Sequence, residues 1–291
     1  MTSRIAYNNP DGNGSLGLSY HYELLSDQRR LGPLRRAIAL TANGRRVLES
    51  GAGSGILSIL AAKAGARMVY TIEQDPKVSA FTRYNVERSG YSNIIRIIEK
   101  DTRCVSLHDI DDLPVDMVIA EHLSTWQVTE AQIPVMNHIN KTLATETAIR
   151  IPESLVNYAE LACSKFLFED LVDLRTLYFC FSGIRKPIIL SGPVEVQRVY
   201  FNALNPTFVS RSVKLRATRN GVVNSLRLTS PLVIFQDIHF HSSDSLVPPV
   251  IIPLEKDIAV SAGDVVEIHI DYECATDWSR VRCEAQATSS Q

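Results

Sequence analysis

Residues 45–75 read RRVLESGAGSGILSILAAKAGARMVYTIEQD. This stretch predicts a short apolar strand, a glycine-rich loop, an apolar helix and a second strand that ends in the acid Glu73. Glycines let a backbone turn tightly and bring a ligand close to bare amide groups, and the helix behind them presents a positive dipole end. Glu73 lies twenty-two residues after Gly51. At that distance a carboxylate accepts hydrogen bonds from the hydroxyls of a ribose.

The glycine spacing indicates which nucleoside ligand the loop holds. Dinucleotide sites normally keep Gly-x-Gly-x-x-Gly, whereas this loop has Gly51, Gly53 and Gly55, with Glu49 just before it. The shorter spacing is more typical of a site for S-adenosylmethionine, which has no pyrophosphate. We therefore predict S-adenosylmethionine as the cofactor, bound by the three glycines and Glu73. A glycine-rich turn in some other α/β domain is the alternative.

Composition and charge exclude several classes of protein. The 291 residues are 45% hydrophobic and 21% charged, as in ordinary globular proteins, and the net charge is −2. A broad basic surface for nucleic acid is therefore not expected, and no apolar run approaches the roughly 18 residues that span a bilayer. The five cysteines are scattered without a CxxC pair. This pattern is typical of reduced thiols in the cytoplasm rather than a disulfide frame or a metal site, so we expect a cytoplasmic protein without a metal.

The first half of the chain predicts a Rossmann-like domain over residues 19–152. Residues 1–18 are polar and glycine-rich, and we expect them to be flexible. Residues 20–41 have helical spacing, which Pro33 is expected to break into two helices. From Val47 onward strands alternate with helices, as in βαβ units with a mostly parallel sheet. The expected strands are Met68–Glu73, Ile94–Glu99 and Val115–Glu121, and the expected helices are Ile56–Lys63, Lys77–Ser89 and Glu130–Asn140.

The pattern changes after Ile151-Pro152, and residues 153–291 predict an antiparallel β domain, either a barrel or a sandwich. Helical periodicity remains only over roughly Leu161–Leu177. Turn signals separate the other runs. The expected strands are Val194–Phe201, Ser210–Ala217, Val222–Leu228, Leu232–Phe240, Val265–Tyr272 and Val281–Ala285.

Two glutamates follow the strand that starts at Val115. Ligands of doubly wound sheets bind beyond the carboxyl ends of the strands, so Glu121 is expected beside the reactive end of the cofactor. Glu130 reaches the same pocket if residues 122–129 form a loop. Two carboxylates in one small site repel each other unless a bound cation lies between them. A guanidinium has the required charge and can donate paired N–H hydrogen bonds to carboxylates. The residues alone also allow a solvated strand-end acid and a first-turn helix acid.

Residues 20 to about 155 resemble the catalytic domain of the protein arginine N-methyltransferases. Val47–Ala66 is similar to the family's cofactor motif, and Thr145–Ser154 is similar to the exit into its β-barrel. His21–Arg30 resembles the helix that closes over the cofactor, with Arg30 at the position that holds the methionine carboxylate. The resemblance implies a class I methyltransferase domain followed by a C-terminal antiparallel β-barrel.

Glu121 and Glu130 match the family's two-glutamate loop at the family's spacing. The resemblance therefore implies that both are catalytic and that they grip a guanidinium beside the sulfonium of the cofactor. His122 and Trp126 stand inside this loop, and we expect them to contact the substrate.

Departures from the family fall mostly on the acceptor side. The glutamate that the family places near the adenine is Arg103 here, which leaves Asp101 or the backbone of Thr102 for that contact. The N-terminal Tyr-Phe-x-x-Tyr motif is not recognisable, and Ser245-Leu246-Val247 replaces the Thr-His-Trp loop of the barrel. These departures favour free arginine or another small guanidino compound over an arginine-containing peptide.

The sequence thus predicts an S-adenosylmethionine-dependent N-methyltransferase that acts on a guanidino nitrogen, most simply that of arginine. Two alternatives stay open: a methyltransferase for an oxygen, carbon or amine acceptor, and a cofactor-binding member without transfer activity. Members of the family commonly dimerise through an arm from the barrel. Residues 165–187 are expected to form a shortened arm, so we expect a homodimer.

Overall fold

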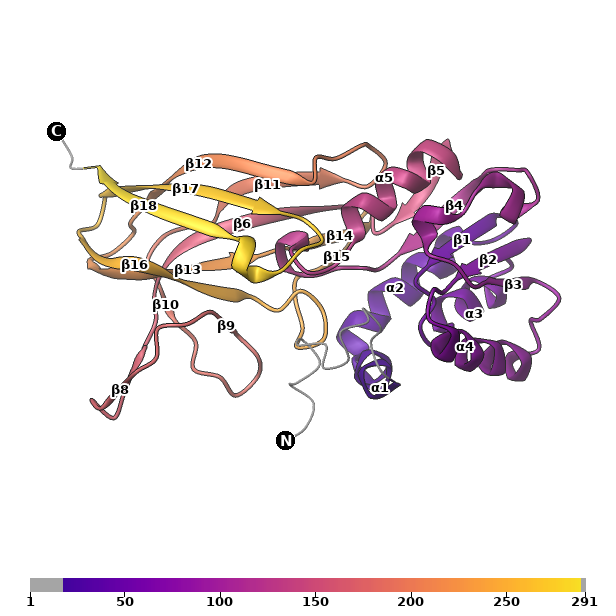
Figure 1. Cartoon of the computed structure of the whole chain (residues 1–291), viewed down its shortest axis with the longest axis horizontal. Helices are drawn as coiled ribbons and strands as arrows, with labels where there is room; N and C mark the ends of the chain where they lie inside the picture. Colours follow the sequence, from indigo (N-terminus) through magenta and orange to yellow (C-terminus); the bar gives the residue numbers. More distant parts are fainter. Residues whose placement is uncertain (1–17, 289–291) are drawn as a thin grey trace.

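The computed structural model describes residues 18–288. A parallel sheet with its helices occupies one end of the molecule, and antiparallel strands occupy the other (Figure 1). The N-terminal segment that we expected to be flexible lies outside the described residues, except for Leu18. Within residues 18–288, no helix is both long and apolar enough to cross a membrane.

The two N-terminal helices, α1 (Leu18–Ser26) and α2 (Gln28–Thr41), are separated at Asp27. Oδ1 of Asp27 accepts hydrogen bonds from the backbone N–H groups of Arg29 at 3.0 Å and Arg30 at 3.2 Å. The expected break at Pro33 is therefore wrong, because this side-chain cap starts the second helix earlier and Pro33 lies inside α2. The cap places Arg30 in the first turn of α2.

The parallel sheet has the strand order β3-β2-β1-β4-β5, and all neighbours are parallel. The strands and helices that were predicted from Val47 onward are present, with ends that differ by at most two residues, whereas β5 was not predicted. The central strands β1 and β4 are almost entirely buried, because helices cover both faces. The strands are β1 (Arg46–Ser50), β2 (Met68–Ile72), β3 (Ile95–Ile98), β4 (Val115–Ala120) and β5 (Ala144–Ile151); the connecting helices are α3 (Ile56–Lys63), α4 (Pro76–Ser89) and α5 (Gln132–Thr142).

The direction of the chain through this sheet reverses between β1 and β4, since β2 and β3 lie on one side of β1 and β4 and β5 lie on the other. Such a switch point opens a crevice at the carboxyl ends of the strands, where α/β proteins bind ligands. Short 3₁₀ segments follow β3 and β4 at this edge, η2 (Thr102–Cys104) and η4 (Thr125–Gln127).

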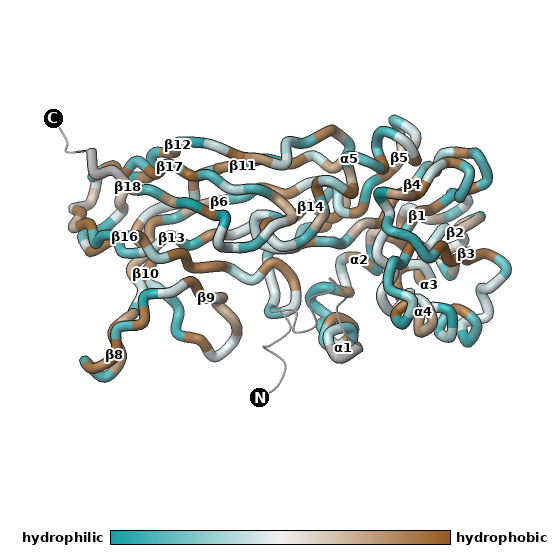
Figure 2. The backbone as a smooth tube through the Cα atoms, in the orientation of Figure 1, coloured by the Kyte–Doolittle hydropathy of each residue, from teal (hydrophilic) through white to brown (hydrophobic). Residues whose placement is uncertain are grey.

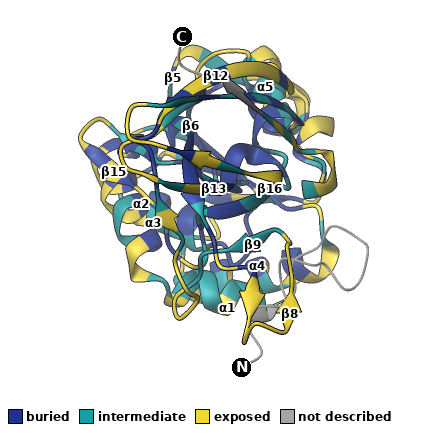
Figure 3. Ribbon diagram, turned by 90° about the vertical axis from the view of Figure 1, so that its left-hand side faces the viewer, coloured by how far each residue is buried: buried dark blue, intermediate teal, exposed yellow. Residues whose placement is uncertain are grey.

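The C-terminal half is an antiparallel barrel built around β6 (Ser154–Cys163). β6 pairs with four other strands, and the main path of its sheet is β15-β14-β6-β13-β16-β9. A second sheet has the order β12-β17-β18; β11 lies beside β12 and β16 beside β18, which brings the two sheets around a common core (Figure 3). The remaining strands are β9 (Tyr178–Phe179), β10 (Ile188–Ile189), β11 (Val194–Tyr200), β12 (Phe208–Arg216), β13 (Gly221–Thr229), β14 (Leu232–Phe235), β15 (Ile238–Phe240), β16 (Val250–Val260), β17 (Val265–Glu273) and β18 (Arg282–Thr288).

Two expectations for this half are corrected. Leu161–Leu177 is not helical: it starts inside β6 and continues into a hairpin of β7 (Leu167–Phe168) and β8 (Val172–Asp173). Pairing of β6 with distant strands decides its conformation over the local spacing. The strand β16 was not predicted, because Pro253 and the following charges interrupt its apolar run. The strands β6, β9 and β10 were not predicted either. The six predicted runs all form strands, although Leu232–Phe240 is a hairpin of two strands.

The hairpin β7–β8 projects from the barrel on the side of α1 (Figure 1), and much of it is apolar (Figure 2). Its exposed apolar side chains include Leu171, which is 85% exposed, Val172 at 58% and Leu174 at 56%. The segment that we expected to be an arm is therefore an apolar projection.

Candidate active site

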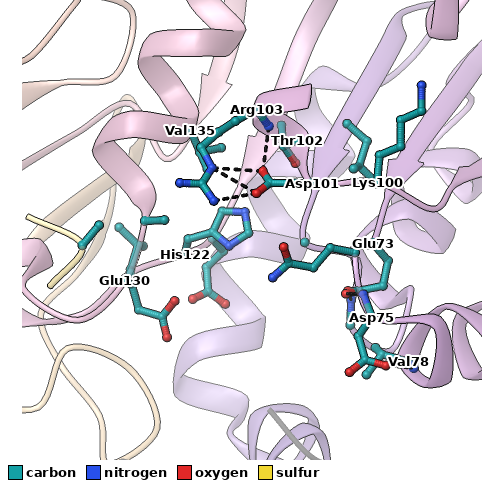
Figure 4. A pocket seen from close by; sticks show the side chains of 18 of the residues that line it. Glu73, Asp75, Val78, Lys100, Asp101, Thr102, Arg103, His122, Glu130 and Val135 are labelled. Atoms are coloured by element: carbon teal, nitrogen blue, oxygen red, sulfur yellow. Dashed lines mark hydrogen bonds and ion pairs between the residues drawn. The ribbon is translucent and has the colours of Figure 1, made fainter. Parts of the chain in front are cut away.

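A cavity of about 380 Å³ lies at the carboxyl ends of β1, β2 and β4 (Figure 4). Its walls come from α1, the glycine loop, the ends of β2 and β4, the segment after β3, the loop before α5 and Ala275 of the barrel. The position is the switch point of the parallel sheet, and Ala275 is contributed by the C-terminal half.

The glycine loop contributes space rather than free amides. Gly51, Gly53 and Gly55 all have positive φ, at 73°, 54° and 78°. The N–H groups of Gly51 and Ala52 both donate to the carbonyl of Ile72 at 2.9 Å, and that of Gly55 donates to the carbonyl of Ala52 at 2.8 Å. The expectation of bare amide groups is therefore wrong for these residues.

Two histidine rings cover the loop. An ideal Cβ on Gly51 would lie 2.3 Å from Cε1 of His122, and one on Gly53 would lie 2.7 Å from Cε1 of His21. Only a glycine leaves room for each ring. Gly55 does not line the cavity; it is the left-handed N-cap of α3, with a methyl group of Thr82 against it.

Glu73 is held at the end of β2 by two backbone donors. Its Oε2 accepts from the N–H of Gly53 and its Oε1 accepts from the N–H of Asp75, both at 3.0 Å. Each oxygen keeps a lone pair for another donor. The side chain lines the cavity, where the hydroxyls of a ribose are predicted to bind.

Glu121 lines the cavity at the end of β4, and its carboxylate forms a buried ion pair with Arg30. Glu121 and Arg30 were predicted to bind different groups, so their direct contact is a finding of the structure. Gln132 of α5 fixes the backbone on both sides of Glu121. Its Nε2 donates to the carbonyl of Ala120 at 2.9 Å, and its Oε1 accepts from the N–H of His122 at 2.8 Å.

Arg30 also lines a smaller cavity of about 50 Å³ beside the glycine loop. Its Nη1 donates to the carbonyl of Leu24 at 3.2 Å, and its buried Nε–H has no acceptor among the described residues. A buried donor without an acceptor is costly. A carboxylate in the smaller cavity would satisfy it, so the residues present fit the methionine end of S-adenosylmethionine.

Glu130 lines the same cavity as Glu121, so residues 122–129 return to the pocket as a loop. Figure 4 shows Glu130 and Glu73 on opposite sides. No hydrogen bond reaches the Glu130 carboxylate from the described residues, and burial raises its pKa to about 7. The turn that presents it is tightened by Ser124, whose Oγ accepts from the N–H groups of Thr129 at 3.0 Å and Glu130 at 3.2 Å.

His122 faces the cofactor side of the cavity. Its Nε2 lies 2.8 Å from Oγ of Ser50, which lies 2.7 Å from Oγ1 of Thr102. Burial lowers the pKa of His122 to about 4, so the ring is neutral at pH 7. Asp101 and Thr102 both line the cavity, and the Asp101 carboxylate is paired with Arg103 at 3.0 Å from Nε.

Trp126 does not line the cavity, which corrects its predicted contact with the substrate. Its side chain is fully buried against the barrel, where Nε1 donates to the carbonyl of Tyr158 at 3.3 Å. Its ring packs on Tyr272 with centroids 5.1 Å apart. The inward position removes the large apolar ring from water, and this burial stabilises the folded loop.

Several cavity residues were not predicted. His21 belongs to the helix that was expected to close over the cofactor, but only Arg30 was selected from it. Lys100 and Gln74 also line the cavity, and nothing in the sequence marks them except that each comes after a predicted strand. Ala275 enters from the barrel, 145 residues after Glu130. Among residues 18–288, no three His, Cys, Asp or Glu side chains gather in a geometry that would hold a metal.

Comparisons with known proteins agree with this geometry. The family of the ribosomal protein L11 methyltransferase (PrmA) matches residues 34–149. An uncharacterized protein of Methanocaldococcus jannaschii is 30% identical over 266 residues, which cover 90% of this chain and 95% of that protein. The Arginine N(omega)-methyltransferase of Streptomyces achromogenes is 30% identical over 148 residues, 50% of this chain and 40% of that protein.

The fold is shared with the Trypanosoma brucei PRMT1 enzyme–prozyme heterotetrameric complex with AdoHcy. The TM-score is 0.77, with 18% identity over 93% of each chain. The likeness therefore includes the barrel as well as the parallel sheet. A methyltransferase domain that continues into this barrel identifies the chain as an S-adenosylmethionine-dependent methyltransferase, and arginine methyltransferases are among the relatives that match part of it.

Proposed function

We propose that the chain transfers a methyl group from S-adenosylmethionine to a guanidino nitrogen of free arginine or of another small guanidino compound. The observation that carries this proposal is the meeting of Glu121 and Glu130 in one cavity with the glycine loop and Glu73. Two acids around a small site suit a planar cation with several N–H donors.

The cofactor side of the cavity fits a nucleoside with a carboxylate. Glu73 would accept from the ribose hydroxyls, and the Nε–H of Arg30 would donate to the carboxylate. The neutral ring of His122 adds no charge beside a cationic cofactor. Thr102 and Asp101 lie where the base is predicted to bind. When bound, S-adenosylmethionine supplies a methyl group on a sulfonium.

The acceptor side would be held by the two glutamates. Oε2 of Glu121 is paired with Arg30, which leaves Oε1 for a guest. The raised pKa of Glu130 reflects burial without a cation, and a guanidinium would favour its ionised form. The two carboxylates would hold the guanidinium so that one of its nitrogens faces the methyl group of the cofactor. They would also polarise the guanidinium so that this nitrogen gains electron density.

Two observations favour a small acceptor over a protein. The segment Ser245–Val247 stands where the family has its Thr-His-Trp loop, and Oγ of Ser245 donates to Oδ2 of Asp27 at 2.6 Å. This bond ties the barrel loop to the junction between α1, which lines the cavity, and α2. The Streptomyces relative is named for methylation of arginine without mention of a protein, unlike the mouse relative, which is named Protein arginine N-methyltransferase 7.

The test is mass spectrometry of the products after incubation with labelled S-adenosylmethionine and a set of acceptors. The set contains free arginine, an arginine-rich peptide, a phenol and a primary amine. We expect methylated free arginine, at a higher rate than peptide and at a rate that Glu121→Gln reduces. Label only in the phenol or amine would favour another acceptor class, and no transfer despite cofactor binding would favour a member without activity.

We also propose that two copies associate through the apolar hairpin β7–β8. Its leucines would otherwise face water, and apolar surface of this kind commonly marks an interface.

A further inference from the structure

The loop between the two glutamates contains two strained residues that the barrel holds in place. Trp126 and Gln127 have φ of 57° and 54°, a conformation that residues with side chains rarely adopt. The N–H of Trp126 donates to Oγ of Ser230 at 2.8 Å, and the carbonyl of Gln127 accepts from the N–H of Ala275 at 3.0 Å. Each strained residue is thus bonded to the barrel.

Asn157 of β6 is the centre of a buried polar cluster beneath this loop. Its Oδ1 accepts from Oγ of Ser230 at 2.7 Å. Its Nδ2 lies 3.2 Å from Oε1 of Gln127, 3.0 Å from Oε1 of Gln197 and 3.0 Å from the hydroxyl of Tyr272. The Tyr272 hydroxyl also donates to Oε1 of Gln197 at 2.6 Å. These five residues, called the Asn157 cluster below, are at most 8% exposed.

The cluster is connected to Glu130 by an unbroken series of hydrogen bonds. Asn157 donates to the side chain of Gln127, and Nε2 of Gln127 donates to the carbonyl of Ser124 at 3.0 Å. Oγ of Ser124 accepts from the N–H of Glu130 at 3.2 Å. The series starts in the barrel and ends at the backbone of a predicted catalytic acid.

A polar cluster in a barrel core needs a physical reason, because desolvated polar groups stabilise a fold less than apolar packing does. Four of its members come from barrel segments far apart in sequence, near β6, β11, β13 and β17, and the fifth is Gln127 of the loop. Nε2 of Gln197 has no partner among the described residues, but every other member is joined to Asn157 by a hydrogen bond, and such buried networks favour one arrangement of the backbone. The arrangement specified here is that of the strained turn.

We propose that the Asn157 cluster is a positioning device that holds the loop so that Glu130 faces the acceptor. Its members are positioning residues, because they act through the loop and do not line the cavity. The inference rests on the proposed function, since it takes Glu130 to be the group that contacts the guanidinium.

A matched pair of serines tests the inference. Ser230 and Ser225 are both fully buried in the barrel, but the hydroxyl of Ser225 bonds only within the barrel, 2.9 Å from Oγ of Ser164 and 3.1 Å from Oδ1 of Asn224. We expect Ser230→Ala to lower kcat/KM for the guanidino substrate by about 10- to 100-fold, the scale of a displaced catalytic group. Its Kd for S-adenosylmethionine should stay within about 3-fold of wild type, and Ser225→Ala should keep wild-type kcat/KM.

Two further readouts separate positioning from general loss of stability. Activity should rise with pH as Glu130, whose pKa burial raises to about 7, loses its proton. A released loop would expose Glu130 to water, so this rise should move to lower pH in Ser230→Ala and not in Ser225→Ala. The chain has two tryptophans, so Trp278→Phe leaves Trp126 as the only tryptophan. In that background we expect the emission of Trp126 to move to longer wavelength in Ser230→Ala and not in Ser225→Ala. Tyr272→Phe, which removes one hydroxyl from the cluster, should give the same changes on a smaller scale.

Wild-type kinetics and emission in Ser230→Ala would overturn the inference, and so would equal losses in Ser225→Ala. If the wild-type protein methylated no guanidino compound while Ser230→Ala still shifted the emission of Trp126, the proposed function would fail and the anchoring of the loop would stand.

Discussion

At the scale of single residues, Glu130 is an acid in the cavity wall whose carboxylate has no hydrogen-bond partner among the described residues. Burial raises its pKa to about 7. The ionised form should grip a cation and the protonated form should not. Activity is therefore expected to depend on pH in the range where this side chain loses its proton.

The first prediction is a rising limb in kcat/KM for the guanidino substrate as pH increases through about 7, because a raised pKa means that the active carboxylate forms only above it. Glu130→Gln should remove this limb and lower kcat/KM by about 10²- to 10³-fold, the scale for loss of one preorganised electrostatic group. Steady-state rates across the pH range measure both. Glu99→Gln, an exposed acid bonded to Arg83, is the control and should keep the limb. A Glu130→Gln variant that keeps the limb would assign it to another group.

The second prediction compares two glycines in the same backbone conformation. Gly51 and Gly90 have φ of 73° and 78°, but an ideal Cβ on Gly90 would meet nothing within 4 Å, whereas one on Gly51 would meet the His122 ring. Gly90→Ala should lose about 1 to 2 kcal/mol of stability from the left-handed backbone. Gly51→Ala should lose more and should weaken cofactor binding, because the ring has to move. Thermal unfolding and cofactor titration measure the two effects.

Adding His122→Ala to Gly51→Ala should recover the part of the loss that comes from the ring, but not the part that comes from φ. Equal destabilisation by Gly51→Ala and Gly90→Ala would show that the ring gives way at little cost. The close packing of His122 on the glycine loop would then contribute little to the stability of the protein.

At the scale of elements, the third prediction concerns the junction of α1 and α2. Asp27 caps α2 through Oδ1 and accepts from Ser245 of the barrel through Oδ2. Asp27→Ala should lose about 1 kcal/mol for the cap, and it should weaken binding of S-adenosylmethionine because Arg30 lies in the capped turn. Ser245→Ala removes only the link to the barrel. It should leave the cap intact and lower affinity less, as measured by calorimetry. Greater loss of affinity in Ser245→Ala would mean that the link, rather than the cap, positions Arg30.

The parallel half could be predicted from the sequence because its signals are local. The glycine loop, the acid Glu73 and the apolar strands each follow from neighbouring residues, and the structure places their ends within two residues. The start of α2 was missed because Pro33 was taken as the break between the two helices, whereas the side-chain cap of Asp27 sets it. Asp27 followed by Gln28-Arg29-Arg30 lacks the apolar pattern that usually draws attention to a cap.

The support of the site could not be predicted in this way. Asn157, Gln197 and Tyr272 lie on three strands, and only the closure of the barrel brings them together. Trp126 was expected in the pocket because an aromatic residue in a catalytic loop is a common substrate contact. Its inward ring contacts Tyr158 and Tyr272, and its N–H bonds to Ser230, more than a hundred residues later, so no local pattern distinguishes the two orientations.

At the scale of the whole molecule, the barrel forms part of the active site as well as following it. Ala275 supplies a wall of the cavity, and the Asn157 cluster holds the loop that carries Glu130. The barrel also meets the N-terminal helices through Ser245. The reactive centre therefore depends on both halves of the chain, and a fragment that ends near residue 152 would lack Ala275 and the support of one glutamate.

The last prediction concerns association of two chains through the hairpin β7–β8. Leu171 and Leu174 are exposed on it, and the burial of such side chains is a common source of dimer stability. We expect the double variant Leu171→Asp with Leu174→Asp to sediment as a monomer, while wild type sediments as a dimer. Leu204→Asp is the control, because Leu204 is 57% exposed on the turn after β11, outside the hairpin. A monomeric wild type, or a dimer that survives the double variant, would show that the hairpin does not join two copies, and its apolar surface would need another partner.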